Sequence, residues 1–481
     1  MNTASTHTAA RRDRMAAVAR RLTVAVTVTA LGGCASFSAD SGFGSVETAA
    51  QQYLGKEVRW AQSASDQEAI GRRVAELLAA PLSADDAVQI ALLNNRGLQA
   101  SFFELGITQA EVVQAGRLPN PGFSFGRSRR GDEVELERGL HLNLARLLAL
   151  PLVREVEGRR LAQIQRAVTM NVLSLAADTR KAYYQAVAAE ESVRYMRRVM
   201  QVAEASAELA RRMAQVGNFS RLQHAREQGF YADAALNMAR AQQVQRATRE
   251  RLTRQLGLWG EQTGYALPER LPDLPKTPRD LPDIERVALA QRLDVQAAKL
   301  ATEQTAKNLG LTRATRFVNV LEVGVAHNSS NEAPAQRGWE IGFELPIFDW
   351  GDARVARAEG VYMQSLHRAA EIAINARSEV REAYGAYRSN YDIARHQRDE
   401  IVPLQARIAE ENLLRYNGML IGVFELLADA RAQIAGVNAY IESLRDFWSA
   451  QADLEMALIG KPGLSAPAGP AKTAEAGGAA H

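Results

Sequence analysis

Two very long helical segments constrain the fold of this 481-residue chain more than any other feature. Residues 153–215 and 352–417 are rich in Ala, Arg and Glu, and as helices each would extend on the order of 90–100 Å. In the first segment apolar residues recur every three or four positions, which is the spacing of a coiled-coil seam. Met196 and Met200 belong to this seam, so packing explains them better than metal binding does. Pro403, in the second segment, is expected to remove a backbone hydrogen bond and bend the helix.

The sequence contains two copies of one plan, about 200 residues apart. Residues 91–100 (ALLNNRGLQA) align with residues 288–297 (ALAQRLDVQA). Each copy predicts a first helix, two short strands, a very long helix and a return helix, and the two first helices are expected at 84–116 and 284–312. We expect a tether with a short helix at 34–83, a first repeat at 84–257, a proline-rich connector at 258–283, a second repeat at 284–460 and a disordered tail at 461–481.

Four short segments alternate between apolar and polar residues, as strands between two environments do. Their length of ~9–12 residues is what a tilted strand needs to cross a bilayer. They span about residues 121–130, 133–146, 316–328 and 337–346. The side chains expected to face lipid are Phe123, Phe125, Trp339, Ile341 and Phe343.

The first of these segments also spells a hydrolase motif. Gly122-Phe-Ser-Phe-Gly126 matches the G-x-S-x-G nucleophile elbow, which needs a buried strand before the serine and a helix after it. Two prolines precede the motif and an arginine-rich segment follows it, so that context is missing. We interpret the segment as a strand in which Ser124 faces water, and a hydrolase built on Ser124 as a distant alternative.

Four strands in one chain cannot cross a membrane alone. An open sheet leaves edge N–H and C=O groups unpaired in hydrocarbon, at a cost of several kcal/mol each. The sheet is therefore expected to close by association. Three chains would give twelve strands, an even number within the range of bacterial barrels.

The N-terminus predicts export and lipid attachment. Residues 1–33 combine an arginine-rich start with a short apolar stretch, as a signal peptide does. They end in Leu-Gly-Gly before Cys34, the single cysteine of the chain, and this group resembles the lipobox of bacterial lipoproteins. The resemblance implies cleavage before Cys34 and its acylation, and Ala35 favours delivery to the outer membrane. The alternative is a lone buried cysteine.

Charge and motifs exclude several function classes. Outside residues 1–33 acidic and basic side chains nearly balance, so nucleic acid is not an implied partner. The sequence contains no P-loop, no H-E-x-x-H, no paired-cysteine site and no dinucleotide fingerprint, and its histidines lack metal-ligand spacing. We expect no enzyme activity, no cofactor and no bound metal.

Five short motifs stand out in the two copies: Leu118-Pro-Asn-Pro121, Glu344-Leu-Pro-Ile-Phe-Asp-Trp-Gly351, Ile401-Val-Pro-Leu404, Tyr416-Asn-Gly418 and Glu425-Leu-Leu-Ala-Asp-Ala-Arg431. They resemble motifs of the TolC-like outer-membrane efflux proteins, and the lipobox points to the lipoprotein branch of that family. The resemblance implies a mainly α fold with a small β part, in which a trimer forms a twelve-stranded barrel continued by a helical tunnel. It also implies a periplasmic adaptor and an inner-membrane pump of the RND type as partners.

The same resemblance implies a gate and an adaptor-contact tip at the turns between long and return helices. The candidate gate is Glu425 and Asp429, which lie four residues apart and so on one helix face. Three copies would form two negative rings that hold cations. The alternative places both on the solvated outer face, near Arg431. The candidate tip comprises Gly217, Asn218, Phe219, Ser220, Gly418, Met419, Leu420 and Ile421.

We interpret the chain as a passive outer-membrane exit duct that receives substrates from a pump and an adaptor. The alternative, from another class, is a periplasmic coiled-coil lipoprotein scaffold that binds partners and makes no pore.

Overall fold

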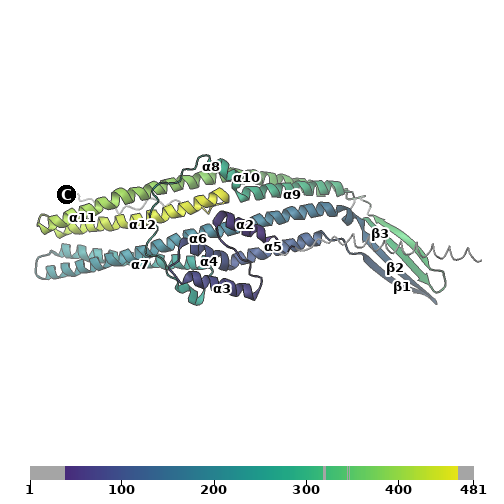
Figure 1. Ribbon diagram of the computed structural model, residues 1–481, viewed down its shortest axis with the longest axis horizontal. Helices are drawn as coiled ribbons and strands as arrows, with labels where there is room; N and C mark the ends of the chain where they lie inside the picture. The colour runs from purple at the N-terminus through teal and green to yellow at the C-terminus, as the bar shows by residue number, and fades with distance from the viewer. Residues whose placement is uncertain (1–37, 39, 318–320, 344, 346, 464–481) are drawn as a thin grey trace, which may run out of the picture. The chain divides into compact units, whose positions relative to one another are not determined.

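The computed structural model describes residues 38, 40–317, 321–343, 345 and 347–463 (Figure 1). Its contacts divide the chain into two compact units. Unit 1 contains Met1–Gly42, Glu104–Ile164 and Leu300–His367, and unit 2 contains Phe43–Phe103, Gln165–Lys299 and Arg368–His481. Each unit therefore draws on both sequence copies. The predicted lipidation site Cys34 and the predicted signal peptide lie outside the described residues, as does most of the tail.

Unit 1 contains a four-stranded antiparallel sheet in the order β1-β2-β3-β4 (Figure 1). Neighbouring strands in the sheet are also neighbours in the sequence, so the sheet is a simple meander. A tight turn at Gly131, whose φ of 62° suits glycine, joins the first two strands. The strands are β1 (Gly122–Arg130), β2 (Glu133–Asn143), β3 (Leu321–Ser330) and β4 (Gln336–Phe343).

The second strand is shorter than its alternation predicts, because a helix begins at Leu144. The Asn143 side-chain oxygen accepts a hydrogen bond from the Arg146 N–H at 2.8 Å, which satisfies one of the free amides of the first turn. The long helix α6 (Leu144–Gln215) therefore starts before residue 153 and includes Pro151. The apolar residues 144–150 belong to this helix rather than to a strand.

The helical part of unit 1 is tied by polar contacts between its helices. Arg159 of α6 lies 3.1 Å from Glu155 and contacts Glu303 at 2.5 Å, and Lys307 lies 3.3 Å from Glu155. Glu303 and Lys307 belong to α9 (Leu293–Thr315), which extends from unit 2 into unit 1. The hydroxyls of Thr305 on α9 and Ser365 on α10 (Asp352–His396) are 2.7 Å apart.

Unit 2 is helical. Its buried aromatic side chains include Tyr387 and Tyr391 of α10, whose rings lie 5.5 and 5.8 Å from the ring of Phe447 of α12 (Val423–Ile459). The elements of unit 2 not yet named are α2 (Phe43–Leu54), α3 (Ala64–Leu78), α4 (Ala84–Asn94), the start of α5 (Arg96–Ala115), α7 (Arg221–Leu256), the short η1 (Gly260–Gly264), α8 (Ile284–Gln291), the π-helical turn η2 (Gln397–Ile401) and α11 (Val402–Asn417).

The proline-rich connector is fixed to these helices by hydrogen bonds to its backbone. The Tyr391 hydroxyl donates to the Lys276 carbonyl at 2.8 Å, and the Trp448 indole N–H donates to the Pro272 carbonyl at 3.0 Å. The Arg279 N–H donates to the Tyr387 hydroxyl at 3.0 Å. The prolines prevent a helix here, so the backbone groups of the connector lack helical partners. Aromatic side chains provide hydrogen bonds to these groups instead.

The first helix of each copy is broken, whereas the sequence predicted one continuous helix. The breaks fall at Asn95 and Arg292, which occupy the same column of the alignment between the copies. Asn95 donates to the Gln255 carbonyl at 3.0 Å. Arg292 is 1% exposed and pairs with Asp294 at 2.6 Å and Glu379 at 2.7 Å. Extended backbone at each break lets a polar side chain tie neighbouring helices together.

The second long helix is interrupted just before Pro403. The π-helical turn η2 lets the Val402 N–H reach back five residues to the Gln397 carbonyl. Pro403 then stands in the first turn of α11. Proline has no N–H to donate and clashes with the carbonyl four residues before it, and a widened turn relieves both problems.

Candidate functional site: a two-faced sheet and a helical tip

The strand register places every residue expected to face lipid on one side of the sheet. Phe123, Leu140, Val325 and Trp339 form one row across all four strands. Ile341 lies in the next row, with Val323 and Leu142, and Phe343 in the one after, with Leu321. The five aromatic and aliphatic side chains named in the sequence analysis are between 51% and 74% exposed. A face this apolar and this open needs a covering of lipid or protein.

The opposite face carries a hydrogen-bonded chain of side chains that spans all four strands. The Ser124 hydroxyl lies 3.0 Å from His141 Nε2, and His141 Nδ1 lies 2.7 Å from a Glu340 carboxylate oxygen. Ser124 comes from β1, His141 from β2 and Glu340 from β4. The network is half-exposed, because the side chains of His141 and Glu340 keep 34% and 53% of their surface open.

Two glycines make room for this chain. A Cβ atom at Gly139 would lie 2.4 Å from the Ser124 hydroxyl, and one at Gly324 would lie 2.7 Å from a Glu340 oxygen and 2.8 Å from His141 Nδ1. Contacts under about 3 Å between a Cβ and another heavy atom essentially do not occur, so larger residues would displace the network. The His141 side chain therefore lies across the sheet over positions that have no side chain of their own.

Charge is sorted between the two faces. The strand register places all five glutamates of the described strands on the polar face, together with His141 and Arg130. No carboxylate of these strands lies on the apolar face. The five are Glu133, Glu135, Glu137, Glu322 and Glu340.

Ser124, His141 and Glu340 have the order of a hydrolase triad, but the strand geometry does not suit catalysis. Ser124 is in the middle of a strand, paired with Gly139, with no elbow and no helix behind it. Backbone N–H groups of a strand lie in the plane of the sheet while side chains stand perpendicular to it. They therefore cannot point at the oxyanion that an attack by Ser124 would create. The polar chain is better explained as a tie between strands.

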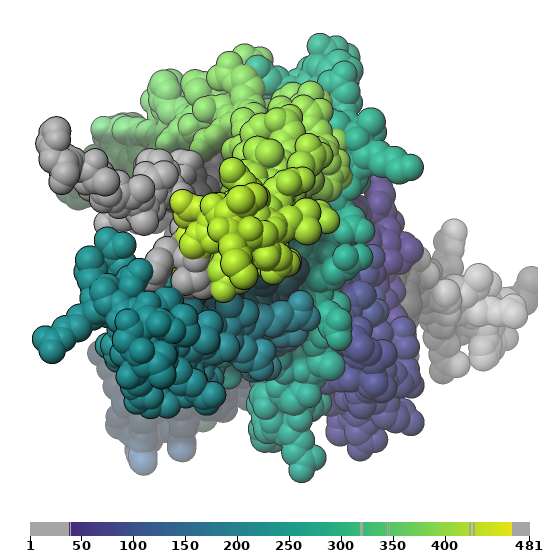
Figure 2. Space-filling model, turned by 90° about the vertical axis from the view of Figure 1, so that its left-hand side faces the viewer, coloured from purple at the N-terminus to yellow at the C-terminus, as the bar shows by residue number. Residues whose placement is uncertain are grey.

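The two candidate tip turns lie at one end of unit 2 (Figure 2). In the first, Gly217 has φ of 81° and ends α6, while the Ser220 hydroxyl accepts the Gln223 N–H at 3.2 Å and begins α7. In the second, Gly418 ends α11, and Met419 and Leu420 are 93% and 74% exposed. Asn218 and Phe219 complete the first turn, and Ile421 the second. Apolar side chains this open can contact a partner.

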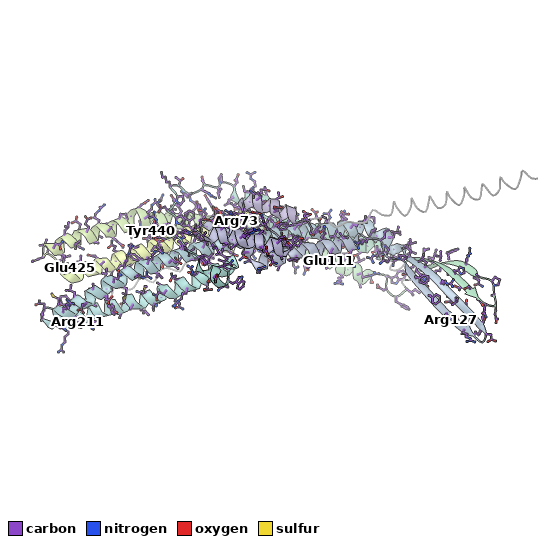
Figure 3. All side chains as sticks on the ribbon, turned by 60° about the horizontal axis from the view of Figure 1, so that its bottom comes forward. Arg73, Glu111, Arg127, Arg211, Glu425 and Tyr440 are labelled. Carbon is purple, nitrogen blue, oxygen red and sulfur yellow. The ribbon has the colours of Figure 1, made fainter. Side chains whose placement is uncertain are left out.

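The candidate gate residues have different surroundings. Glu425 is exposed near the start of α12 (Figure 3), and no ion pair to it occurs among the described residues. Asp429 is half-buried and accepts a short hydrogen bond from the Asn412 side chain of α11. Arg431 does not pair with either of them.

Arg431 instead meets a buried carboxylate that the sequence analysis missed. Glu227 of α7 is 1% exposed, accepts a hydrogen bond from the Ser206 hydroxyl of α6 at 2.8 Å, and lies 3.7 Å from Arg431 Nη2 of α12. The Arg431 guanidinium also lies 4.3 Å from the centre of the Phe230 ring. Glu227 precedes Phe230 by three residues and Ala234 by seven, so it lies on the same helix face as these apolar residues. A charged residue on an apolar seam was the sequence signal that could have indicated a buried carboxylate.

Met196 and Met200 pack against the apolar cluster around Val199, Ala203 and Ala234, as the seam predicts. Among the described residues no group of three or more His, Cys, Asp or Glu side chains could hold a metal ion. None of the described helices is both long and apolar enough to cross a membrane.

A two-faced four-stranded meander, to which each sequence copy contributes two strands and a pair of long helices, is the fold of the TolC-like outer-membrane channels, and structural comparison confirms this fold. The CmeC outer-membrane channel of Campylobacter jejuni superposes with a TM-score of 0.68 at 18% identity, over 78% of this chain and 85% of that chain. The open state of the MtrE outer-membrane channel of Neisseria gonorrhoeae gives 0.63 at 20% identity, over 78% and 88%.

In sequence, the chain is similar to the cobalt-zinc-cadmium resistance protein CzcC of Cupriavidus metallidurans, with 23% identity over 284 residues. This similarity covers 56% of the chain and spans 64% of the length of that relative. No family model matches the chain.

Proposed function

We propose that the protein is the outer-membrane channel of a tripartite efflux system, a passive duct through which substrates from an inner-membrane pump leave the cell. Three chains bring their sheets together as a twelve-stranded barrel, and the paired helices of each chain line a passage across the periplasm. The fold shared with outer-membrane channels supports this assignment. The Ser124 network does not favour a hydrolase, since it lacks oxyanion donors.

The observation that carries the proposal is the two-faced sheet with open edges. Within the described part of the chain, β1 and β4 each pair with a strand on one side only. Their free N–H and C=O groups cannot remain unpaired in lipid, so β1 of one chain must pair with β4 of the next. Closing the ring turns the face of Phe123 and Trp339 toward lipid and the face of Ser124 and Glu340 toward water. A soluble coiled-coil scaffold has no use for such a sheet.

The glutamates of the polar face support cations as cargo. Three copies place fifteen carboxylates around the passage against three arginines, if every strand contributes as in one chain. A ring of carboxylates favours cations and opposes anions. The similarity to a cobalt-zinc-cadmium resistance protein supports divalent metal ions among the substrates.

The ends of the duct follow from the remaining predicted sites. Cys34 anchors the chain in the outer membrane through its acyl chains. The exposed Met419 and Leu420 contact a periplasmic adaptor, which joins the trimer to a pump of the RND type. Glu425 and Asp429 form the periplasmic gate, in which three copies attract cations to the entrance.

Reconstitution into planar bilayers tests the duct. Conductance steps with a reversal potential that favours cations are expected. Replacing Glu135, Glu137 and Glu340 by Gln on the polar face should shift the reversal potential toward zero, whereas the matched change Arg127→Gln on the apolar face should leave it unchanged. Absence of conductance from inserted trimers, also after Glu425→Gln and Asp429→Asn have neutralised the gate, would support the scaffold instead.

A further inference from the structure

The apolar face of the sheet changes character toward its hairpin end. Toward the hairpin end, the next residue on the same face after Phe125 of β1 is Arg127, and the next after Trp339 of β4 is Arg337. Arg138 of β2 is in register with Phe125 and with His327 of β3, and His327 in turn with Arg337. A basic band, defined by Arg127, Arg129, Arg138 and Arg337, therefore borders the apolar rows on the same face. Arg127 marks this end of the sheet in Figure 3.

The basic band is poor in partners. Arg129 lies 3.9 Å from Asp132, a loose contact at the turn. Within the described ranges, no carboxylate pairs with Arg127, Arg138 or Arg337, and all three are exposed. Because every glutamate of the strands lies on the other face, none can reach around to neutralise them. The charge of the band is available to a ligand outside the protein.

The spacing matches the structure of a lipid leaflet. Side chains two positions apart on one face of a strand are ~7 Å apart, so Arg337 lies ~7 Å beyond Trp339 along β4. The polar headgroup layer of a bilayer is ~5–7 Å thick on each side of the hydrocarbon. Arginines at this height reach the phosphates of lipids whose acyl chains cover the row of Phe123 and Trp339.

The band belongs to the leaflet away from the helices. β2 runs into α6 at Asn143, and β3 and β4 are joined at the same end as the turn at Gly131. If the helices extend into the periplasm, as the proposed function requires, the hairpin end faces the outer leaflet.

Resting on that proposed function, we propose that the basic band binds the phosphate groups of phosphorylated lipids in the outer leaflet of the outer membrane. Arginine suits this task, since its planar guanidinium donates two parallel hydrogen bonds to a phosphate. The bound lipids seal the outer surface of the barrel and hold it at a fixed depth in the membrane.

The test compares binding of two lipids to the detergent-purified trimer. The probes are fluorescent lipid A with two phosphates and the same lipid with both phosphates removed. Each arginine near an anionic lipid surface is worth about a fivefold change in affinity, so the wild-type protein should prefer the phosphorylated lipid at least tenfold. The variant R127Q/R138Q/R337Q should lose this preference, and the corresponding triple Lys variant should keep most of it.

A matched control changes three charged residues at the same height on the other face, R130Q/E135Q/E137Q, and should retain the preference. An equal preference in the Gln triple variant, or an equal loss in the control, would overturn the proposal. If the Gln triple variant does not assemble, the three single variants must each weaken phosphorylated-lipid binding severalfold. Conductance separates the two ideas: a wild-type protein that forms channels without preferring phosphorylated lipid refutes only the lipid site, and one that forms no channel refutes the duct.

Discussion

The buried carboxylate of Glu227 makes the strongest prediction about the helical end of unit 2. Replacing Arg431 by Met removes its cation and leaves Glu227 with the Ser206 hydroxyl as hydrogen-bond donor. Breaking a fully buried ion pair costs about 3–5 kcal/mol. Arg431 keeps 42% of its side chain exposed and its Nη2 lies 3.7 Å from the carboxylate, so solvent screens much of the attraction. We therefore expect a cost of about 1–2 kcal/mol, borne where α12 meets α6 and α7.

Hydrogen exchange of the backbone amides of α12 around Arg431 measures this cost locally. A loss of about 1–2 kcal/mol corresponds to about 5–30-fold faster exchange in that segment, while amides near Phe447 should not change. Glu227→Gln keeps the acceptor for Ser206 but removes the buried charge. The double variant R431M/E227Q should therefore exchange at nearly the wild-type rate.

The matched control is Arg415→Met, which removes an exposed arginine from the last turn of α11. It should leave exchange in α12 unchanged. The reasoning is refuted if Arg431→Met does not speed exchange, or if adding Glu227→Gln to it brings no recovery, since the buried carboxylate would then have no part in holding α12.

Three further predictions concern single side chains. Gly324→Val should displace His141 and Glu340 and lower the temperature at which the proposed trimer dissociates on gels. Gly338→Val, where an added Cβ meets no atom within 4 Å, should change this temperature much less. Equal effects would contradict a role of the Ser124–His141–Glu340 network in holding the strands together. Burial raises the pKa of Glu191, which accepts the Leu271 N–H, so its contribution to stability is largest below the unfolded-state pKa and is lost as the pH rises through the raised value. Thermal unfolding at increasing pH should accordingly show that Glu191→Gln becomes more stable relative to the wild type as the pH rises above the usual carboxylate range, and that the exposed Glu204→Gln does not. Ser124→Ala should leave single-channel conductance unchanged, and a fluorophosphonate probe should not label wild-type Ser124; specific labelling that Ser124→Ala abolishes would revive the hydrolase alternative.

Local patterns in the sequence were sufficient to predict the four strands. Alternation alone identifies the strands and their faces, because the side-chain period of a strand is two and each face has one environment. The apolar row of Phe123 and Trp339 follows directly. The end of β2 was placed too late because the residues after Asn143 are apolar enough to continue either a strand or a helix.

Contacts between distant segments could not be predicted. The chain of Ser124, His141 and Glu340 depends on the register of four strands, which no single segment encodes. Asn95 favours a helix end but Arg292 is a good helix former, and their partners in other helices explain why both helices break at this column. Glu227 follows the spacing of the α7 seam, but its ion pair with Arg431 of α12 depends on a contact that the sequence does not reveal.

The open edges of the sheet also affect the protein before it assembles. If the chain assembles as proposed, it first presents free strand edges beside a face of exposed aromatic rings, and this combination leads β-strands to pair with the wrong molecule. Correct assembly and irreversible aggregation then compete for the same surface, and both become faster as the concentration of the chain rises. Overproduction would therefore lower the fraction of chains that assemble correctly, unless a chaperone shields the sheet on its way to the membrane.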